Sequence, residues 1–371
     1  MAGAGLRKRL ARMIAHSGPM SLAEFMHVAM SDPVDGYYNR KPAIGSKGDF
    51  ITAPETSQLF GEMIAIWCVS AWHGMGSPGT VALVEAGPGN GTLMADLLRS
   101  ARNFPDFLSA IHVHLVETSP AMMARQRERL SGLANDIHWH ASMEAIPPMP
   151  MLFIANELLD VMPIRQYVKS GRNWLENCVG LDGAGKLAFT LGAGQIDPAL
   201  LPEGHQLEPD GAVFEISPAR EAFILALCER LKTFNGAALL IDYGHSASGF
   251  GDTFQALRSH TYADPLAEPG QADLTSHVDF APLRALARAT DIAAAPICCQ
   301  GDFLLAMGLL QRAGVLGATA DAARREQIRG EVQKLAAPDE MGNLFKVMGL
   351  WHCTDRPIPD LPPFHMPKTE H

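Results

Sequence analysis

The sequence has few cysteines and few charged residues for its length. Six cysteines occur among 371 residues, and no two of them form a C-x-x-C pair or a spacing typical of a zinc site. We therefore expect reduced, mostly buried thiols and no bound metal. Charged residues make up only 19% of the chain and hydrophobic residues 47%, which excludes overall disorder and provides apolar surface for a sizeable core.

Long apolar runs and a basic charge balance are also absent. No stretch reaches the ~20 consecutive apolar residues that a membrane-spanning helix needs. The basic cluster at residues 7–12 is not followed by the apolar core of a signal peptide. With 40 acidic side chains against 30 basic ones, the net charge is -10. Because nucleic acids attract basic surfaces, this acidic balance predicts no nucleic-acid binding. The lack of long apolar runs predicts no membrane insertion.

Short apolar runs that begin near residue 80 alternate with helical segments. The runs lie at 81–84, 111–116, 151–155, 238–241 and 344–351. Continuous apolar strands separated by helices predict an α/β protein with a mostly parallel sheet covered on both faces. Before them, the sequence predicts helices, one of which begins with the capping box at residues 21–24.

Two stretches interrupt the alternation of strands and helices. Residues 164–191 contain short runs separated by glycine-containing turns, which predict an inserted antiparallel meander. Residues 245–280 are too long and too rich in Gly, Pro, Asp and His to be an ordinary connection, which indicates a functional role. We expect an N-terminal helical region over 1–79, a core over 80–351 with insertions at about 164–215 and 245–280, and a tail over 352–371.

The most informative segment is a glycine-rich loop behind the first predicted strand. It contains Glu85, Gly87, Gly89, Gly91, Thr92 and Leu93. Glycines allow a sharp turn and a close ligand approach, and the following helix presents free amides; the plain alternative is an ordinary strand-to-helix turn. Thr92 stands where the dinucleotide fingerprint G-x-G-x-x-G requires glycine, which disfavours a nicotinamide-dependent dehydrogenase. G-x-G-x-G behind an acid instead resembles the first motif of class I S-adenosylmethionine-dependent methyltransferases.

Polar residues also follow two further predicted strands. Glu117, with Ser119 nearby, ends the second strand and is positioned to accept the ribose hydroxyls of a nucleoside. Asn156, Glu157 and Asp160 follow the strand at 151–155, at the sheet edge where ligands bind. Glu157 and Asp160 could hold a guanidinium and orient one nitrogen towards the sulfonium. The alternative for either acid is a cap on a following helix.

Several segments together resemble the MidA family, which comprises mitochondrial complex I assembly methyltransferases and their bacterial relatives. They lie at 48–58, 60–62, 85–93, 155–160, 241–244, 272–280 and 300–304. The resemblance implies a seven-stranded Rossmann-like core with N-terminal helices and inserted α+β segments covering the cofactor. It also implies S-adenosyl-L-methionine as cofactor, and methylation of a protein arginine in a subunit of the respiratory NADH dehydrogenase.

The resemblance assigns Gly87, Gly89 and Gly91 to the cofactor loop and Asn156 and Glu157 to the active-site loop. The latter is similar to the first half of the double-glutamate loop of arginine methyltransferases, whose second glutamate has no match here. A non-catalytic assembly chaperone that retains the cofactor pocket is the rival interpretation. The short N-terminus favours the bacterial cytoplasm, with the mitochondrial matrix as the alternative.

Overall fold

A computed structural model describes residues 3–40, 52–134, 136–258, 261–354 and 361–364. Its central sheet has seven strands in the order β15-β17-β10-β5-β2-β3-β4, and two short strands, β14 and β16, join β10 and β17. The strands are β2 (Val81–Ala86), β3 (Ile111–Val116), β4 (Ile137–His140), β5 (Met151–Asn156), β10 (Gly236–His245), β14 (Val278–Asp279), β15 (Ala293–Ala294), β16 (Cys298–Cys299) and β17 (Phe345–His352). The five strands from β4 to β10 run parallel, and β17 runs antiparallel to β10. The predicted mostly parallel sheet is confirmed.

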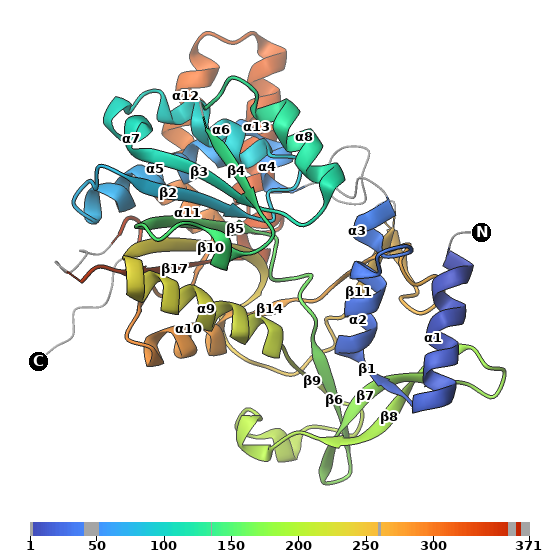
Figure 1. The fold of residues 1–371 in the computed structure, drawn as a ribbon. Coiled ribbons are helices and arrows are strands. Elements are labelled where there is room, and N and C mark those ends of the chain that lie inside the picture. Colours follow the sequence, from blue (N-terminus) through green and yellow to red (C-terminus); the bar gives the residue numbers. More distant parts are fainter. Residues whose placement is uncertain (1–2, 41–51, 135, 259–260, 355–360, 365–371) are drawn as a thin grey trace, which may run out of the picture.

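Helices cover both faces of this sheet (Figure 1). Alternate residues of each strand point to opposite faces, so Leu83 of β2 joins one apolar cluster and Val84 joins the other. The first cluster is closed by α5 (Gln58–Gly74), α6 (Thr92–Ala101), α7 (Pro105–Ala110) and α8 (Pro120–Leu130), and the second by α9 (Pro218–Phe234) and α10 (Phe280–Ala289). Because both faces are covered, the central strands β2 and β5 are buried at every position rather than at alternate positions.

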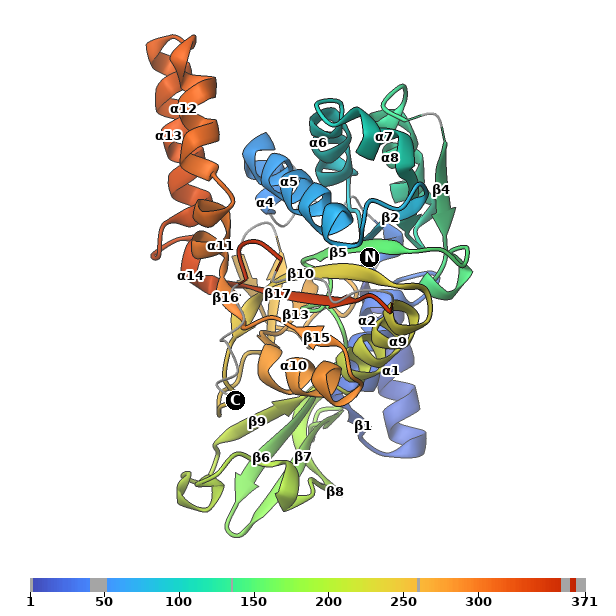
Figure 2. The ribbon, with the colours of Figure 1, turned by 90° about the vertical axis from the view of Figure 1, so that its left-hand side faces the viewer.

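Residues 300–344 contain several separate helices. They are α11 (Gln300–Ala306), α12 (Leu309–Ala318) and α13 (Ala322–Ala336), with the short α14 (Met341–Leu344) after them. Gly308, at φ +100°, separates α11 from α12, and Asp321 caps α13. Figure 2 shows α12 and α13 lying side by side and extending away from the sheet.

The predicted meander is confirmed and forms part of a second, antiparallel sheet. Its strands are β1 (Met20–Ser21), β6 (Arg165–Ser170), β7 (Asn173–Leu181), β8 (Leu187–Gln195) and β9 (Val213–Ile216). The helices α1 (Gly3–Ser17) and α2 (Leu22–Ser31) pack on this sheet through a third apolar cluster that includes Leu10, Phe25 and Val179. The predicted capping box is present at the start of α2, where Ser21 and Glu24 bond each other reciprocally. The first two helices therefore pack on the insertion rather than on the parallel sheet.

The second insertion forms a small three-stranded sheet. Its strands are β11 (Gln255–Arg258), β12 (Thr261–Ala263) and β13 (Asp273–Thr275), paired in the order β12-β11-β13. Two short helices, α3 (Tyr37–Arg40) and α4 (Ala53–Thr56), precede α5, and short 3-10 turns lie at Met143–Ala145, Pro198–Leu200 and His205–Leu207. Ala256 and Leu274 belong to the same apolar cluster as α2, so the two insertions and the first helices share a core.

The parallel sheet has its topological switch point between β2 and β5. From β2 the chain proceeds to β3 and β4 on one side, then returns to β5 on the other side. In such sheets a crevice opens beyond the carboxyl ends of the two strands at the switch point, and ligands bind there. Glu85 at the end of β2 and Asn156 at the end of β5 therefore face the expected ligand site.

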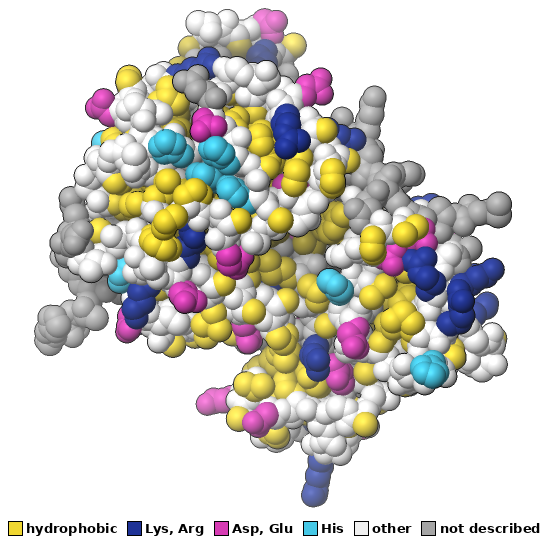
Figure 3. Space-filling model, in the orientation of Figure 1, with side chains coloured by type: hydrophobic (Ala, Val, Ile, Leu, Met, Phe, Trp, Pro, Cys, Tyr) yellow, Lys and Arg dark blue, Asp and Glu magenta, His cyan; other side chains and the backbone are white. Residues whose placement is uncertain are grey.

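Histidines of β3 and β4 gather on one face of the molecule (Figure 3). His114 Nδ1 lies 2.9 Å from His140 Nε2, and the ring of His114 stacks on that of His138 with centroids 5.1 Å apart. Burial lowers the pKa of His114 to about 4, so the His114 ring is neutral near pH 7. Within the described ranges, no group of His, Cys, Asp or Glu is arranged to hold a metal ion. In the same part of the chain, no helix is long and apolar enough to cross a membrane.

Candidate active site

The glycine loop adopts a backbone that requires glycine. Gly87, Gly89 and Gly91 have φ values of +66°, +51° and +76°, in the left-handed region that L side chains rarely adopt. A Cβ on Gly87 would lie 3.0 Å from Cδ1 of Leu158, in the loop after β5. Gly91 is the N-cap of α6, so Thr92 and Leu93 begin that helix, as predicted. The loop thus turns the chain sharply between β2 and the α6 amides.

A buried glutamine, which no sequence pattern indicates as functional, holds this loop in place. Gln126 of α8 donates through Nε2 to the carbonyl oxygen of Gly89 at 2.8 Å and to Glu117 Oε2 at 3.1 Å. Its Oε1 accepts from the indole of Trp139 at 2.8 Å. With the amide fully buried and satisfied on both ends, the glycine loop and the end of β3 are held at a fixed separation.

The carboxylate of Glu117 is oriented by its own backbone. Oε1 accepts hydrogen bonds from the amides of Thr118 and Ser119, both at 2.8 Å. Ser119 directly precedes α8 and its hydroxyl makes no cap bond to that helix. Glu117 is half-buried and lines the cavity described below, which is the position expected of a ribose-binding acid.

Two buried oxygen acceptors face the switch point without a hydrogen-bond partner in the described residues. They are Oε2 of Glu85 and Oδ1 of Asn156. The other side of the Glu85 carboxyl group accepts from the amide of Met94, and burial raises the pKa of Glu85 to about 8. Unpaired buried acceptors are costly, and a ligand that brings N–H donors and positive charge would satisfy both.

A cavity of about 620 Å³ lies beyond the carboxyl ends of β2, β3 and β5. Its wall includes Gly87, Gly89, Glu117, Ser119, Ser142, Met143, Glu144, Glu157, Leu158, Met162, Phe223 and Tyr38. Residues 142–144, in the segment after β4, supply three of these. A smaller adjoining pocket lies between α4 and the glycine loop and includes Glu85 and Asn156.

The residues present fit S-adenosylmethionine. The cofactor's ammonium group supplies the N–H donors that the Glu85 and Asn156 oxygens lack, and its sulfonium carries a positive charge suited to carboxylates. Glu117 would accept the ribose hydroxyls, and the glycine loop leaves room for the nucleoside. A pyrophosphate, which offers only acceptor oxygens, would instead leave the Glu85 and Asn156 oxygens without donors.

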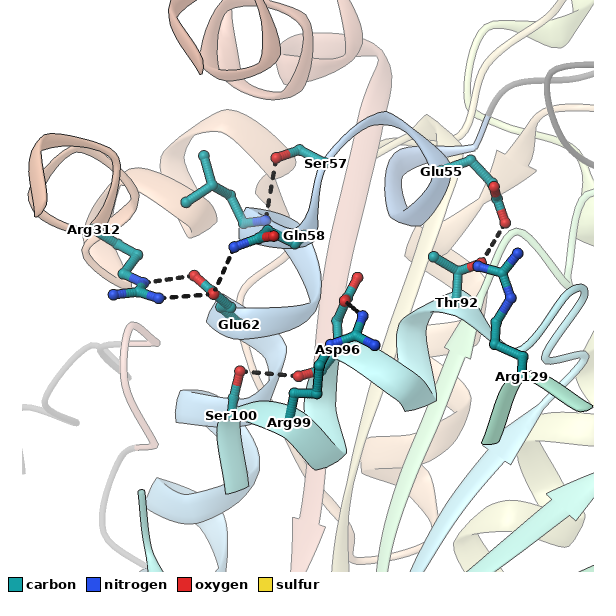
Figure 4. A network of polar contacts seen from close by, with 11 residues as sticks. Glu55, Ser57, Gln58, Glu62, Thr92, Asp96, Arg99, Ser100, Arg129 and Arg312 are labelled. Carbon is teal, nitrogen blue, oxygen red and sulfur yellow. Dashed lines mark hydrogen bonds and ion pairs between the residues drawn. The ribbon is translucent and has the colours of Figure 1, made fainter. Parts of the chain in front are cut away.

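The segment before α5 folds over the glycine loop. Figure 4 shows Glu55 of α4 and Arg129 of α8 converging on Thr92: Thr92 donates to Glu55 and accepts from Arg129 at 2.6 Å. Thr52 precedes α4 but makes no cap bond through its side chain. Gln58 points away, to Glu62, which forms a two-pronged ion pair with Arg312 of α12. Asp49, in the segment 48–58 that carries part of the family resemblance, lies outside the described residues.

Glu157 has a left-handed backbone, with φ +52°, which is uncommon for a residue with a side chain. Its Oε1 accepts from the amide of Ala53 at 3.3 Å and from Nδ2 of Asn156 at 3.0 Å. Burial, and then the nearby Asp160, raise the pKa of Glu157 to about 8. No helix begins between residues 157 and 163, so the helix-cap alternative for Glu157 and Asp160 is wrong. Strained backbones of this kind cluster at functional sites.

Asp160 belongs to a buried polar network. Its Oδ2 accepts from the hydroxyl of Tyr243 at 2.8 Å, while its Oδ1 has no partner in the described part of the chain. Asp242 accepts from the amides of Leu159 and Asp160 at 2.8 and 3.1 Å, which fixes the loop to β10. Burial raises the pKa of Asp160 to about 6, against the lowering effects of Tyr243 and Arg220.

A buried arginine ties the loop after β5 to the second insertion. Arg220, at the start of α9, donates to the carbonyl oxygens of Leu159 at 2.7 Å and of His277 at 2.8 Å. It also bonds the hydroxyl of Ser276 at 2.6 Å, and further contacts reach the Asp160 and Ser276 carbonyls. Since its N–H groups are directed to neutral oxygens, Arg220 acts on Asp160 and Asp242 through its charge and not through hydrogen bonds.

The sheet order, the glycine loop at the switch point and the acids around the cavity define the class of protein: an S-adenosylmethionine-dependent methyltransferase with a Rossmann-like core. Residues 63–297 match a family model described as "Putative S-adenosyl-L-methionine-dependent methyltransferase". The chain belongs to this family, which includes NDUFAF7 and MidA proteins, and its cofactor is S-adenosyl-L-methionine.

Three relatives support this assignment along nearly the whole chain. Protein arginine methyltransferase NDUFAF7 of Danio rerio is 35% identical over 364 residues, covering 91% of this chain and 85% of its own. The Caenorhabditis elegans homolog is 35% identical over 374 residues, covering 94% and 87%. A crystal structure of a Burkholderia thailandensis protein bound to S-adenosyl-homocysteine superposes with a TM-score of 0.80 at 28% identity, covering 95% and 92%.

Proposed function

We propose that this methyltransferase transfers methyl groups to an arginine side chain of a protein. The observation that carries the proposal is the pair of carboxyl groups on the loop after β5: Glu157 lines the cofactor cavity, and Asp160, three positions later, is buried. A guanidinium binds best to carboxylates in a fixed geometry, through charge-assisted hydrogen bonds. The relatives named protein arginine methyltransferase support the same acceptor.

Bound S-adenosylmethionine supplies the methyl group: the S–CH3 bond breaks as the N–CH3 bond forms, sulfur keeps the electron pair, and the acceptor nitrogen loses one proton. Glu85 and Asn156 would hold the amino-acid end of the cofactor, and Glu117 the ribose. Glu157 would orient the acceptor nitrogen, because its carboxylate is already fixed by Asn156 and the Ala53 amide.

The acidic loop also provides the charge that this reaction needs. Both the acceptor and the cofactor are cations, so bringing them together is opposed unless carboxylates lie nearby. Cation binding would lower the raised pKa of Glu157 and leave it ionised. Once the nitrogen has been methylated, Glu157 or Asp160 can take up the released proton and pass it to solvent.

The acceptor protein would dock on the segments added to the core. The two insertions and the helices α1 and α2 share one apolar core and lie beside the carboxyl edge of the sheet (Figure 1). A small-molecule methyltransferase has little need for this additional surface. The family resemblance predicts a respiratory NADH dehydrogenase subunit, or its bacterial counterpart, as the acceptor.

The direct test is to identify the methylated product. The purified protein is incubated with labelled S-adenosylmethionine and an extract of cells that lack it, and the labelled proteins are hydrolysed to amino acids. We expect label in methylated arginine with the wild type and none with Glu157→Gln. The exposed Glu326→Gln serves as the matched control and should label like the wild type.

Two results would contradict the proposal. Label in lysine, in a carboxyl ester or in a small molecule would replace arginine by another acceptor. Cofactor binding without any transfer, in the presence of extract, would favour the rival interpretation of a chaperone that retains the pocket.

A further inference from the structure

The second insertion reaches the active-site loop through a chain of buried hydrogen bonds. In the register between β11 and β13, Gln255 lies opposite Thr275, and its Nε2 donates to the Thr275 hydroxyl at 3.2 Å. Thr275 in turn bonds the hydroxyl of Tyr243, which donates to Asp160 Oδ2 at 2.8 Å. Thr275 is fully buried, and Tyr243 and Asp160 are 6% and 5% exposed. The chain therefore links an inserted strand to the loop after β5 without solvent.

The direction of this chain follows from the groups at its two ends. An amide nitrogen can only donate, and an ionised carboxylate can only accept. Each hydroxyl between them has one proton to give, so Thr275 donates to Tyr243 and Tyr243 donates to Asp160. Hydrogen bonds of this kind stabilise the ionised form of a carboxyl group and polarise one another.

The surroundings of Asp160 have opposing effects on its ionisation. Arg220 favours its ionised form, while burial opposes it and the like charges of Glu157 and Asp242 lie close by. Tyr243 makes the largest side-chain contribution in favour of ionisation. With Oδ2 engaged by Tyr243, Oδ1 is the atom of Asp160 that has no partner in the described residues.

We propose that Gln255, Thr275 and Tyr243 are positioning residues that hold Asp160 ionised, with Oδ1 left to accept a hydrogen bond from the acceptor guanidinium. Asp160 then serves as the second acidic anchor beside Glu157, in place of the second glutamate that the loop lacks. The inference rests on the proposed arginine acceptor. It gives the insertion at 255–275 a role in acceptor binding.

The first test removes single members of the chain. Tyr243→Phe deletes a hydrogen bond to a charged group, so kcat/KM for the acceptor should fall about 10-fold or more, with cofactor affinity changed less than about twofold. Thr275→Val should act in the same direction but less, by about threefold, because it acts through Tyr243. Tyr262→Phe, on the neighbouring β12 and 79% exposed, is the matched control and should have no effect.

A double-mutant cycle separates positioning from general structural support. In an Asp160→Asn background, Tyr243→Phe should lower kcat/KM by less than about twofold, because the Asp160 carboxylate on which Tyr243 acts is gone. Fully additive losses, or a loss of cofactor affinity equal to the loss of kcat/KM, would overturn the proposal.

A measurement without any acceptor tests the Asp160 link independently. Asp160 has a pKa of about 6, raised from the ordinary 3.8, so its contribution to stability is present below the unfolded pKa and is lost as pH rises through about 6. Tyr243→Phe raises this pKa further, so its melting temperature should fall more between about pH 5 and pH 8 than that of the wild type. Asp160→Asn should abolish this difference.

The two readouts distinguish the possible failures. If the wild type does not methylate arginine but the pH effect depends on Asp160, the proposed function is wrong and the link between Tyr243 and Asp160 holds. If arginine is methylated but Tyr243→Phe behaves like Tyr262→Phe in both measurements, the positioning role is wrong.

Discussion

The two sides of the active site are assembled differently. On the cofactor side, the glycine loop and the buried acid Glu85 come from one continuous segment, residues 85–93, and Glu117 and Asn156 are added from the ends of β3 and β5. The acceptor side brings together β5, β10, α9 and the inserted β13, and there Asp160 and Asp242 lie close to Arg220. The difference shows that cofactor chemistry can reside in a local motif, whereas the acceptor loop depends on segments far apart in the chain.

The two sides also differ in what stabilises their buried acidic side chains. Among the described residues, no cation acts on Glu85, so a cationic ligand would offset the cost of its burial. Asp242 is held by backbone amides and by the charge of Arg220 whether or not a ligand is bound. The cofactor side is therefore expected to respond strongly to its ligand, and the acceptor side to be rigid beforehand.

The largest expected effect is on stability, from removal of the arginine that holds the acceptor side together. Arg220→Met leaves several buried carbonyls without donors and two carboxylates without their counter-charge, so the free energy of unfolding should fall by about 3–5 kcal/mol. Denaturant unfolding measures this loss.

The matched control for this prediction lies on the same helix. Arg230 also donates to backbone carbonyls, those of Ile146 and Pro147, but it is far less buried and has no ion pair among the described residues. Arg230→Met should cost about 1 kcal/mol. Equal losses in the two variants would mean that the acceptor side is no more dependent on Arg220 than on any carbonyl-bonded arginine.

On the cofactor side, Gly87→Ala is expected to weaken cofactor binding about 10-fold or more, because φ is positive and the new Cβ would press on Leu158. Calorimetry with S-adenosylmethionine measures the change. Gly132→Ala is the control: its φ is also positive, at +74°, but a Cβ there meets nothing within 4 Å. If both variants bind the cofactor like the wild type, the close approach at Gly87 is not needed for the site.

The smallest expected effect is on the pH dependence of cofactor affinity, because cofactor binding should release a proton from Glu85. With a pKa of about 8, Glu85 is mostly neutral near pH 7, and a cationic ligand favours its ionised form. Affinity should therefore rise with pH up to about 8, by at most 10-fold per pH unit. Calorimetry in buffers of different ionisation enthalpy should show net proton release at about pH 7 that Glu85→Gln reduces. Unchanged proton release in this variant would assign the titration to another group.

The same contrast explains which parts could be predicted from the sequence. The parallel sheet, the meander and the glycine loop follow from local patterns: apolar runs, turn residues and the spacing of Gly87 and Gly89. Gln126 and Arg220 carry no such pattern, because each acts on residues that only the fold brings near. Tyr243 lies in a segment that carries the family resemblance, yet its contact with Asp160 spans 83 positions and could not be read from spacing.

The measurement that tests the division between the two sides most directly compares Glu85→Gln with Glu157→Gln. Cofactor affinity is measured by calorimetry, and arginine methylation at saturating cofactor. We expect Glu85→Gln to weaken cofactor binding about 10-fold and to keep most of the turnover. Glu157→Gln should keep cofactor affinity within about threefold and lose about 10³ in turnover. Equal loss of cofactor binding in both variants, or full turnover by Glu157→Gln, would contradict this division.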